Sequence, residues 1–137
     1  MEKKKGVDSM KKIALLFSHQ LTETQKEELH DSWDVDEFIA LPKQLQQTWS
    51  NMSPDIESVN TLLEPIKTFI SHTLEKGDIV LIQGDFGAVY SMVNFAKSLE
   101  LIPVYATTKR RVSEYKNEEG EMVKKSIFEH RRFRKYE

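Results

Sequence analysis

Two short, uninterrupted apolar runs constrain the fold of this chain more than any other feature of its sequence. The first covers residues 13–17 and stops at Ser18, and the second lies within residues 78–82 and runs into Gln83. Runs of this length that are apolar at nearly every position are typical of parallel strands covered on both faces. The sequence therefore predicts a buried parallel sheet with helices on both sides.

Helical patterns separate the predicted strands. Thr22 is followed three residues later by Gln25, the spacing of a capping box, so a helix is expected to open at Thr22. Further expected elements are a strand at 35–41, a helix from Pro42, a helix lined by Leu62, Ile66, Phe69 and Ile70 that ends at Gly77, a helix to Leu99, and a last parallel strand at 101–106. Such alternation predicts an α/β fold, a Rossmann-like, doubly wound and mainly parallel sheet. The pattern from Val112 to Arg134, with a turn at 117–120, predicts a C-terminal β-hairpin.

Length and composition favour one domain inside a cell. The 137 residues suit a single core, with residues 1–9 expected to be an added or frayed terminus and residues 10–137 the domain. No apolar run approaches the roughly 20 residues of a membrane-spanning helix, so no membrane partner is expected. The chain has no cysteine, which excludes disulfides and thiolate chemistry and fits a cytoplasmic location.

Charge is distributed unevenly along the chain. Residues 107–137 hold ten basic and six acidic side chains, whereas residues 1–106 hold ten basic and sixteen acidic ones. A basic C-terminal segment on an acidic body suggests a surface that meets an anion. A solvated hairpin with ordinary lysines would have the same composition, so charge alone does not decide between them.

Polar clusters follow three of the predicted parallel strands. They are Ser18-His19-Gln20, Gln83-Gly84-Asp85 and Thr107-Thr108-Lys109. In open α/β sheets, ligands bind outside the carboxyl ends of the strands. The sequence therefore predicts a ligand site where the first, third and fourth parallel strands end.

His19 and the basic residues after the last parallel strand are the candidate chemical groups. Three roles are open for His19: a general base, a hydrogen-bond donor to a ligand, or a histidine whose hydrogen bonds are satisfied within the fold. Ser18 offers a hydroxyl to phosphate or ribose. Lys109 and Arg110 suit a phosphodiester, or they protect a sheet edge from aggregation. Further positive charge in the hairpin comes from Arg111, Arg131, Arg132 and Arg134.

The loop at residues 83–87 joins a strand to a helix through two glycines. Glycine lets the backbone approach a ligand, and helix N-terminal amides attract anions. The loop is neither a Walker loop nor a G-x-G-x-x-G fingerprint. Asp85 is either a ligand contact or only the helix cap, and Trp49 either closes a pocket or belongs to the core. His30, His72 and His130 show no metal-ligand spacing, so no metal site is expected.

Four segments together resemble a known family. Phe17-Ser18-His19, Trp49-Ser50-Asn51, residues 83–90 and residues 106–110 are similar to the small standalone CRISPR-associated proteins of type III systems, which are related to the CARF (CRISPR-associated Rossmann fold) domains. The resemblance covers about residues 10–137. It implies a ring nuclease: a homodimer that binds cyclic tetra-adenylate across its two-fold axis and linearises it to a 2′,3′-cyclic phosphate, with no cofactor and no long nucleic acid as partner.

The resemblance also implies roles for individual residues. Other CARF domains have a Gly-Gly-Thr-Lys-like loop where this chain has residues 84–87, so Lys109 or Arg110 would have to supply the charge. The implied catalytic residues are His19, Ser18 and Lys109, and the implied ligand-binding residues are Gln83, Gly84, Asp85, Phe86, Gly87, Thr107, Thr108, Arg110, Trp49 and Asn51. A sensor or sponge that binds the same ligand without cutting it would use the same pocket. An interaction domain or an unrelated nucleotide enzyme is the third interpretation.

Overall fold

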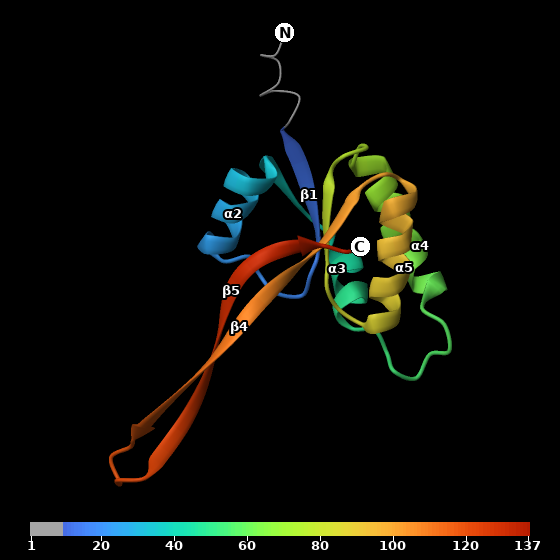
Figure 1. Cartoon of the computed structure of the whole chain (residues 1–137). Coiled ribbons are helices and arrows are strands. Elements are labelled where there is room, and N and C mark those ends of the chain that lie inside the picture. The colour runs from blue at the N-terminus through green and yellow to red at the C-terminus, as the bar shows by residue number, and fades with distance from the viewer. Residues whose placement is uncertain (1–9) are drawn as a thin grey trace.

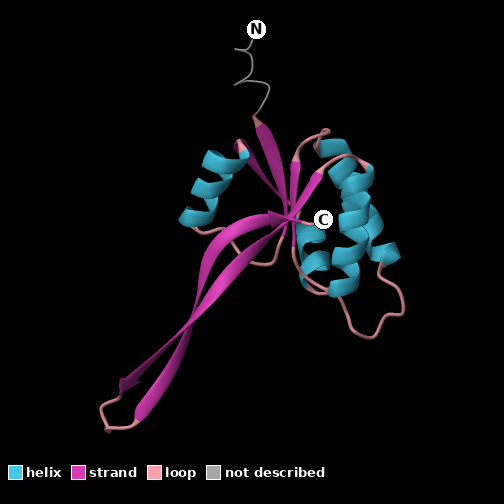
Figure 2. Cartoon of the chain, viewed as in Figure 1, coloured by secondary structure: helices cyan, strands magenta, loops and turns pink. Residues whose placement is uncertain are grey.

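The computed structural model describes residues 10–137, which form five strands and four helices. In chain order these are β1 (Lys11–Leu16), α2 (Glu23–Trp33), β2 (Val35–Ala40), α3 (Lys43–Ser50), α4 (Asn60–Thr73), β3 (Ile79–Ile82), α5 (Phe86–Ser98), β4 (Ile102–Lys116) and β5 (Met122–Lys135). The predicted added or frayed terminus, residues 1–9, lies outside the described residues. The elements form a body from which one long hairpin projects (Figure 2).

One mixed sheet of five strands organises the body. Its strand order is β2-β1-β3-β4-β5. β1 pairs in parallel with both β2 and β3, and β3 pairs in parallel with β4. β5 runs antiparallel to β4 and forms the C-terminal hairpin. The α/β class and the hairpin are therefore confirmed, in a sheet that is parallel across four strands and antiparallel at one edge.

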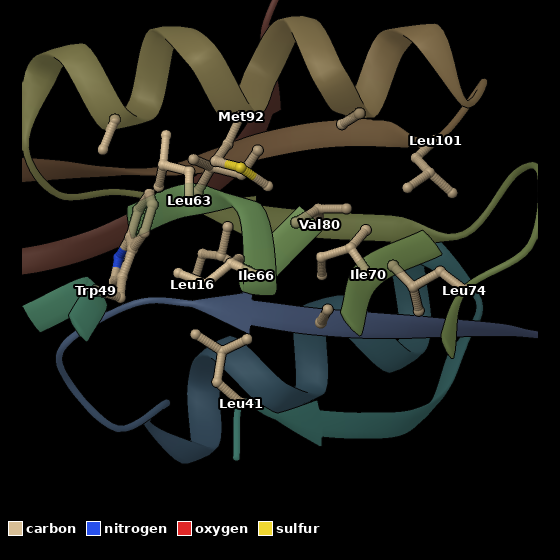
Figure 3. Packing of buried hydrophobic residues seen from close by; sticks show 14 residues of the cluster. Leu16, Leu41, Trp49, Leu63, Ile66, Ile70, Leu74, Val80, Met92 and Leu101 are labelled. Atoms are coloured by element: carbon tan, nitrogen blue, oxygen red, sulfur yellow. The ribbon is translucent and has the colours of Figure 1, made fainter. Parts of the chain in front are cut away.

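Apolar residues pack on both faces of the sheet because successive side chains of a strand point to opposite faces. α2 covers one face, and α3, α4 and α5 cover the other (Figure 1). Ala14 and Leu16 belong to the cluster under the three helices, which Figure 3 shows around Trp49, Ile66 and Met92. The opposite cluster contains Ile13, Phe17, Leu29, Val35, Ile79, Leu81, Val104 and Phe133.

Short sequence motifs correctly predicted where α2 and α3 begin. Thr22 is the N-cap of α2 and completes a capping box with Gln25, as predicted. α3 begins directly after Pro42. No helix within residues 10–137 is both long and apolar enough to cross a bilayer.

Two element predictions were wrong in detail. The last parallel strand does not end at Ala106, because β4 continues to Lys116 and pairs with β5 along almost its whole length. α4 ends at Thr73 rather than Gly77, and it buries Leu63 while Leu62 is exposed. The physical reason for the first error is that an antiparallel partner satisfies the backbone of β4 beyond the body, where no core demands apolar residues.

Candidate functional site

Hydroxyl and amide groups gather where β1 ends. Ser18 Oγ donates a hydrogen bond to Ser50 Oγ at 3.0 Å. Gln46 Nε2 donates to the carbonyl oxygen of Phe17 at 3.0 Å and to Ser50 Oγ at 2.9 Å. Ser50 and Gln46 both come from α3, so the last turn of that helix holds the loop after β1. Ser18 itself stays exposed.

His19 lies beside this cluster with its imidazole exposed. Its ring meets the edge of the Phe17 ring at a centroid distance of 5.5 Å. A cavity of about 540 Å³ opens here, lined by His19, Ser18 and Ser50 together with Lys26 of α2. Among residues 10–137, neither ring nitrogen of His19 has a hydrogen-bond partner, so both nitrogens are open to contact with a molecule in the cavity.

The end of β3 is tied to its neighbours by Gln83 and Trp49. The Gln83 side-chain oxygen accepts from the amide of Ala106 at 2.6 Å, and the Gln83 carbonyl accepts from Trp49 Nε1 at 3.0 Å. A Cβ on Gly84 would lie 3.1 Å from Trp49 Nε1, so a larger residue there would push the indole ring away by a few tenths of an ångström. Trp49 is buried in the core cluster. These three residues build the edge of the site rather than its open surface.

Asp85 caps the helix that follows. Its Oδ2 accepts the amide of Ala88 at 3.0 Å, which satisfies one of the free N–H groups at the start of α5. Phe86, the first residue of α5, is 94% exposed, and Tyr90 one turn later is 73% exposed. Gly87 and Tyr90 line a separate hollow with α4. A bare aromatic ring at a strand-end rim suits stacking on a nucleobase.

The residues predicted after β4 do not lie at the rim. Because β4 does not end there, Lys109 and Arg110 stand three and four residues beyond Ala106, about 10–13 Å farther along the strand. The Thr107 hydroxyl donates to the carbonyl of Arg132 at 2.8 Å and therefore has a structural partner. Asn51 is also engaged, since its Nδ2 donates to the Gln47 carbonyl at 2.8 Å.

The structure thus divides the predicted site residues. It brings Ser18, His19 and the loop at 83–87 to one edge, and it carries Thr108, Lys109 and Arg110 onto the projecting hairpin. Sequence reasoning missed Lys26 and Gln46 as neighbours of His19. The only sequence signal for these two neighbours was that each lies on a helix that directly follows a parallel strand, α2 after β1 and α3 after β2.

A larger groove, of about 810 Å³, lies on the α2 face of the sheet, away from His19. Its charged lining consists of four cations and two carboxylates, and Trp33 and His130 also line it. The cations are Lys11, Arg131, Arg132 and Lys135, and the carboxylates are Glu28 and Asp34. We call this the basic groove. Arg131 is the extra residue of a bulge in β5, since Thr107 pairs with Arg132 and Thr108 with His130.

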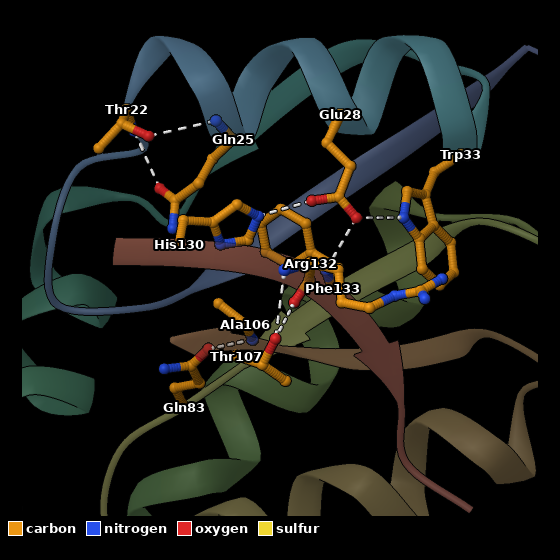
Figure 4. Close-up of polar contacts among 10 residues, drawn as sticks. All are labelled: Thr22, Gln25, Glu28, Trp33, Gln83, Ala106, Thr107, His130, Arg132 and Phe133. Atoms are coloured by element: carbon orange, nitrogen blue, oxygen red, sulfur yellow. Dashed lines mark hydrogen bonds and ion pairs between the residues drawn. The ribbon is translucent and has the colours of Figure 1, made fainter. Parts of the chain in front are cut away.

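Glu28 holds the hairpin to α2 at the wall of the basic groove (Figure 4). Its two carboxylate oxygens contact His130 Nε2 at 2.6 Å and accept from the Phe133 amide at 2.8 Å. Trp33 Nε1 also donates to it, at 3.3 Å. One side chain of α2 therefore satisfies three polar groups, and the base of the hairpin is fixed relative to the body.

The histidines do not form a metal-binding group within the described part of the chain. No three side chains among His, Asp and Glu of residues 10–137 gather as metal ligands would. His30 contacts Asp31 at 3.0 Å, and His130 contacts Glu28. The donor sets are pairs, which suit hydrogen bonding rather than metal coordination.

Tyr136 links the C-terminus to the core. Its hydroxyl donates to the carbonyl of Ile82 at 2.6 Å, and its ring lies 4.7 Å from the Tyr105 ring. Burial raises the pKa of the Tyr136 hydroxyl above its usual value, and the neighbouring Tyr105 adds to the shift. The phenol is therefore held in its protonated, hydrogen-bonded form.

Comparison with known proteins assigns the chain to a family. The model of the Uncharacterized protein MJ1673 family matches residues 11–134. The chain belongs to this family. It is 50% identical over 128 residues to Uncharacterized protein MJ1673 of Methanocaldococcus jannaschii, across 93% of this chain and 98% of that protein. No solved structure matches the chain. The match to the MJ1673 family includes the strand-end site, and it includes the basic groove and the hairpin except for Lys135.

Proposed function

We propose that the protein is a ring nuclease: it binds cyclic tetra-adenylate and linearises it without a metal ion, and so ends a type III CRISPR antiviral signal. The free imidazole of His19 beside Ser18 and Ser50, in a cavity of about 540 Å³, is the observation that carries the proposal. Ribose hydroxyls and phosphates need hydroxyl partners, a proton acceptor and positive charge, and this cavity offers all three.

The proposed reaction is an attack by a ribose 2′-hydroxyl on the adjacent phosphate, with His19 as the proton acceptor. A ring nitrogen of His19 accepts the proton of a ribose 2′-hydroxyl, and the 2′-oxygen attacks the adjacent phosphorus. The bond from phosphorus to the 5′-oxygen of the next nucleoside breaks, that oxygen takes up a proton from solvent water, and His19 returns its proton to solvent. The product is a linear chain with a 2′,3′-cyclic phosphate and a 5′-hydroxyl.

Positioning supplies most of the expected rate gain. Ser18 and Ser50 hold ribose or phosphate oxygens so that attacking oxygen, phosphorus and leaving oxygen lie in line. Lys26 in the cavity offsets the charge that develops on the phosphoryl oxygens. Lys109 stands on the hairpin about 10 Å beyond Ala106, and we propose that it meets the outer part of the ring rather than the phosphate in the cavity. The exposed Phe86 ring is the stacking surface for an adenine.

The proposal includes the fold type and the assembly. Helices on both faces of the sheet and a ligand edge beside the central β1 support a Rossmann-like, CARF-related fold. A ring of four nucleotides has approximate two-fold symmetry, which a homodimer matches with two copies of one surface. We place the protein in the cytoplasm, where the cyclic messenger would be made.

A non-catalytic sponge is the second candidate. The observation that favours it is that His19 has no hydrogen-bond partner to orient its ring among residues 10–137. General bases in enzymes are commonly held by a third group. A sponge would bind the same ring through the same hydroxyls and cations and leave it intact.

The deciding experiment incubates labelled cyclic tetra-adenylate with excess protein and EDTA and resolves the products over time. We expect a linear product ending in a 2′,3′-cyclic phosphate. The His72→Ala variant is the matched control, because His72 is an exposed histidine on α4, far along the chain from the cavity. Binding without cleavage would favour the sponge, and absence of binding to the ring would overturn the proposal.

A further inference from the structure

The hairpin projects from the body as a two-stranded ribbon with exposed apolar side chains. We call residues 108–130 the arm (Figure 1). Phe128 is 66% exposed, Met122 58%, Val112 50% and Tyr115 49%. An isolated two-stranded ribbon is only marginally stable in water. The exposed apolar side chains and the lack of a third strand therefore indicate that another molecule covers part of the arm.

The pairing of β4 and β5 sorts the arm residues onto two faces. Directly opposite residues share a face, so one face holds the rows Thr108/His130, Arg110/Phe128, Val112/Ser126, Glu114/Lys124 and Lys116/Met122. His130 contacts Glu28 of α2, so this face continues into the side of the body that carries the basic groove. It also holds Phe128, Met122 and Val112.

This face is complementary to itself. The Val112/Ser126 row lies in its centre, with Arg110 one row toward the body and Glu114 one row toward the tip. If a second copy stacks on it antiparallel about a two-fold axis through that row, each Arg110 meets the Glu114 of the other copy. Each Phe128 then covers the aliphatic stem of Lys124 in the other copy.

The tip of the arm is acidic and ordered. Asn117 Oδ1 accepts the amides of Glu119 and Glu121, both at 2.9 Å, and Gly120 completes the turn with a φ of +83°. The carboxylates of Glu118 and Glu119 have no ion-pair partner among residues 10–137. We call residues 117–121 the acidic tip.

The basic groove has the opposite charge and the same lack of partners. Within the described part of the chain, none of its four cations, Lys11, Arg131, Arg132 and Lys135, forms an ion pair. Its wall is held rigid by Glu28. One molecule thus carries an unpaired acidic projection at the tip of its arm and a groove with unpaired cations at the base of the same arm.

We propose that two copies pair through their arms, face to face about a two-fold axis at Val112, so that each acidic tip enters the basic groove of the other copy. Chain geometry fits this pairing. Glu118 stands six residues beyond Val112, and Ala106, level with the groove, stands six residues before it, about 20 Å in either direction. The tip of one arm therefore arrives beside Arg131 and Arg132 of the second copy.

Both contacts are needed for a stable pair. The stacked part of the ribbon, about 30 Å long and 10 Å wide, covers only about 300 Å² per copy, well below the roughly 800 Å² per partner of a typical stable interface. The tip in the groove adds area and complementary charge. The axis of this pairing lies about 20 Å along the arm from the ligand edge, so the pairing is a contact separate from the one that a shared cyclic ring would make, and it does not depend on the reaction.

A charge exchange tests the pairing by sedimentation without ligand. We expect the wild-type protein to run at twice the chain mass of 16.0 kDa. A tip variant, Glu118→Lys with Glu119→Lys, and a groove variant, Arg131→Glu with Arg132→Glu, each place like charges together and should associate at least tenfold more weakly. Mixed in equal amounts, the two variants present opposite charges at both contacts, so the dimer should return.

Other outcomes overturn the pairing. These are a monomeric wild type, variants that associate like the wild type, or a mixture that stays monomeric, which would leave the groove to an unrelated anion. All four positions are exposed, so the variants should fold, and circular dichroism checks this. Because the readout is mass, failure here is distinct from failure to bind or cleave the cyclic ring.

Site-directed cross-linking tests the face that is used. The chain has no cysteine, so a Val112→Cys substitution introduces a single thiol per chain. In the proposed pair, this thiol faces the same thiol of the second copy. A short bismaleimide should link this variant into dimers, since stacked sheets lie about 10 Å apart. The Ser113→Cys variant, with its thiol on the opposite face, is the control and should not be cross-linked, so that it runs as a single chain on a denaturing gel. Linking of the Ser113→Cys variant but not of the Val112→Cys variant would overturn the proposal.

Discussion

At the residue scale, the polar side chains near the strand ends divide into those that hold loops and those that stay open. Gln83, Asp85 and Thr107 each have a backbone partner and serve the fold. His19 and Ser18 are exposed on the cavity. Side chains whose hydrogen bonds are used by the fold are less available to a ligand, whereas both ring nitrogens of His19 have no partner among residues 10–137, and Ser18 is bonded only to the hydroxyl of Ser50. The chemical proposal therefore concentrates on His19.

Replacing His19 tests the general base. In His19→Ala we expect the single-turnover cleavage rate to fall by roughly 10²-fold or more, with little change in affinity, because only the proton acceptor is lost. His72→Ala should cleave like the wild type. Equal losses of rate and affinity would show that His19 donates a hydrogen bond instead, and an undiminished rate would remove it from the mechanism.

Tyr136 gives the protein an expected sensitivity to alkali. Its pKa is raised in the folded state, so its stabilising contribution is complete below the unfolded value near 10 and is lost as pH rises through the folded pKa. The Tyr136→Phe variant cannot make the bond to the Ile82 carbonyl, so it should be less stable than the wild type at pH 8. Between pH 8 and pH 11 it should lose less stability than the wild type does. Urea melts at both pH values measure this. Tyr90→Phe, at an exposed position, should follow the wild type throughout.

At the element scale, the start of α5 and the length of β4 have the largest effect on which residues a ligand can reach. α5 begins with an aspartate cap and an exposed aromatic ring at the ligand edge. β4 leaves the body and takes the predicted cations with it. Each element therefore sets which of its residues a ligand can reach.

The two interpretations of Asp85 are separable by paired substitutions. Asp85→Ala should lower the free energy of unfolding by about 1 kcal/mol, because α5 loses its N-cap. Asp85→Asn keeps a capping oxygen and should stay close to wild type in denaturant melts. A large loss of ligand affinity in Asp85→Asn with unchanged stability would show that the carboxylate touches ligand.

Lys109 on the arm tests whether the hairpin reaches the ligand. Lys109→Ala should weaken binding of cyclic tetra-adenylate, and the loss should grow as salt is lowered, because ionic contacts to phosphate are screened at high salt. Lys125→Ala is the matched control, on the same face of the arm but farther from the body. If both variants bind like the wild type at low salt, the arm does not contribute charge to the site.

At the scale of the whole molecule, the structure presents two separate surfaces. The cavity at His19 is the smaller one and is lined by both polar and apolar side chains, whereas the larger basic groove lies on the α2 face beside the hairpin. The larger hollow is therefore not at the predicted ligand edge. We assign the first to the ligand and the second to the acidic tip of another copy, because only the first combines hydroxyls with a free imidazole.

Metal removal tests the chemistry of the whole assembly. We expect cleavage to continue in excess EDTA, because attack by a positioned ribose hydroxyl needs no metal-bound nucleophile. Initial rates with EDTA and with added magnesium or manganese are the measurement. A strict requirement for added metal would contradict the expectation.

Patterns within short stretches of the chain were enough to specify the elements whose signals are local. The apolar runs at 13–17 and 78–82 specified buried strands, because covering both faces of a strand requires apolar residues at successive positions. Thr22 with Gln25 specified a helix start, since a capping box is formed by residues three apart. The parallel sheet and the edge that holds His19 and Gln83 follow from these.

Contacts between distant segments settled which polar residues share a site and where β4 ends. Lys26 and Gln46 reach the edge beside His19 because two helices return to it, a relation over distances that no local pattern records. β4 continues past Ala106 because β5 satisfies its backbone, so its length depends on a partner strand rather than on its own residues. The positions of Lys109 and Arg110 followed from that pairing, and so did the arm and the groove at its base.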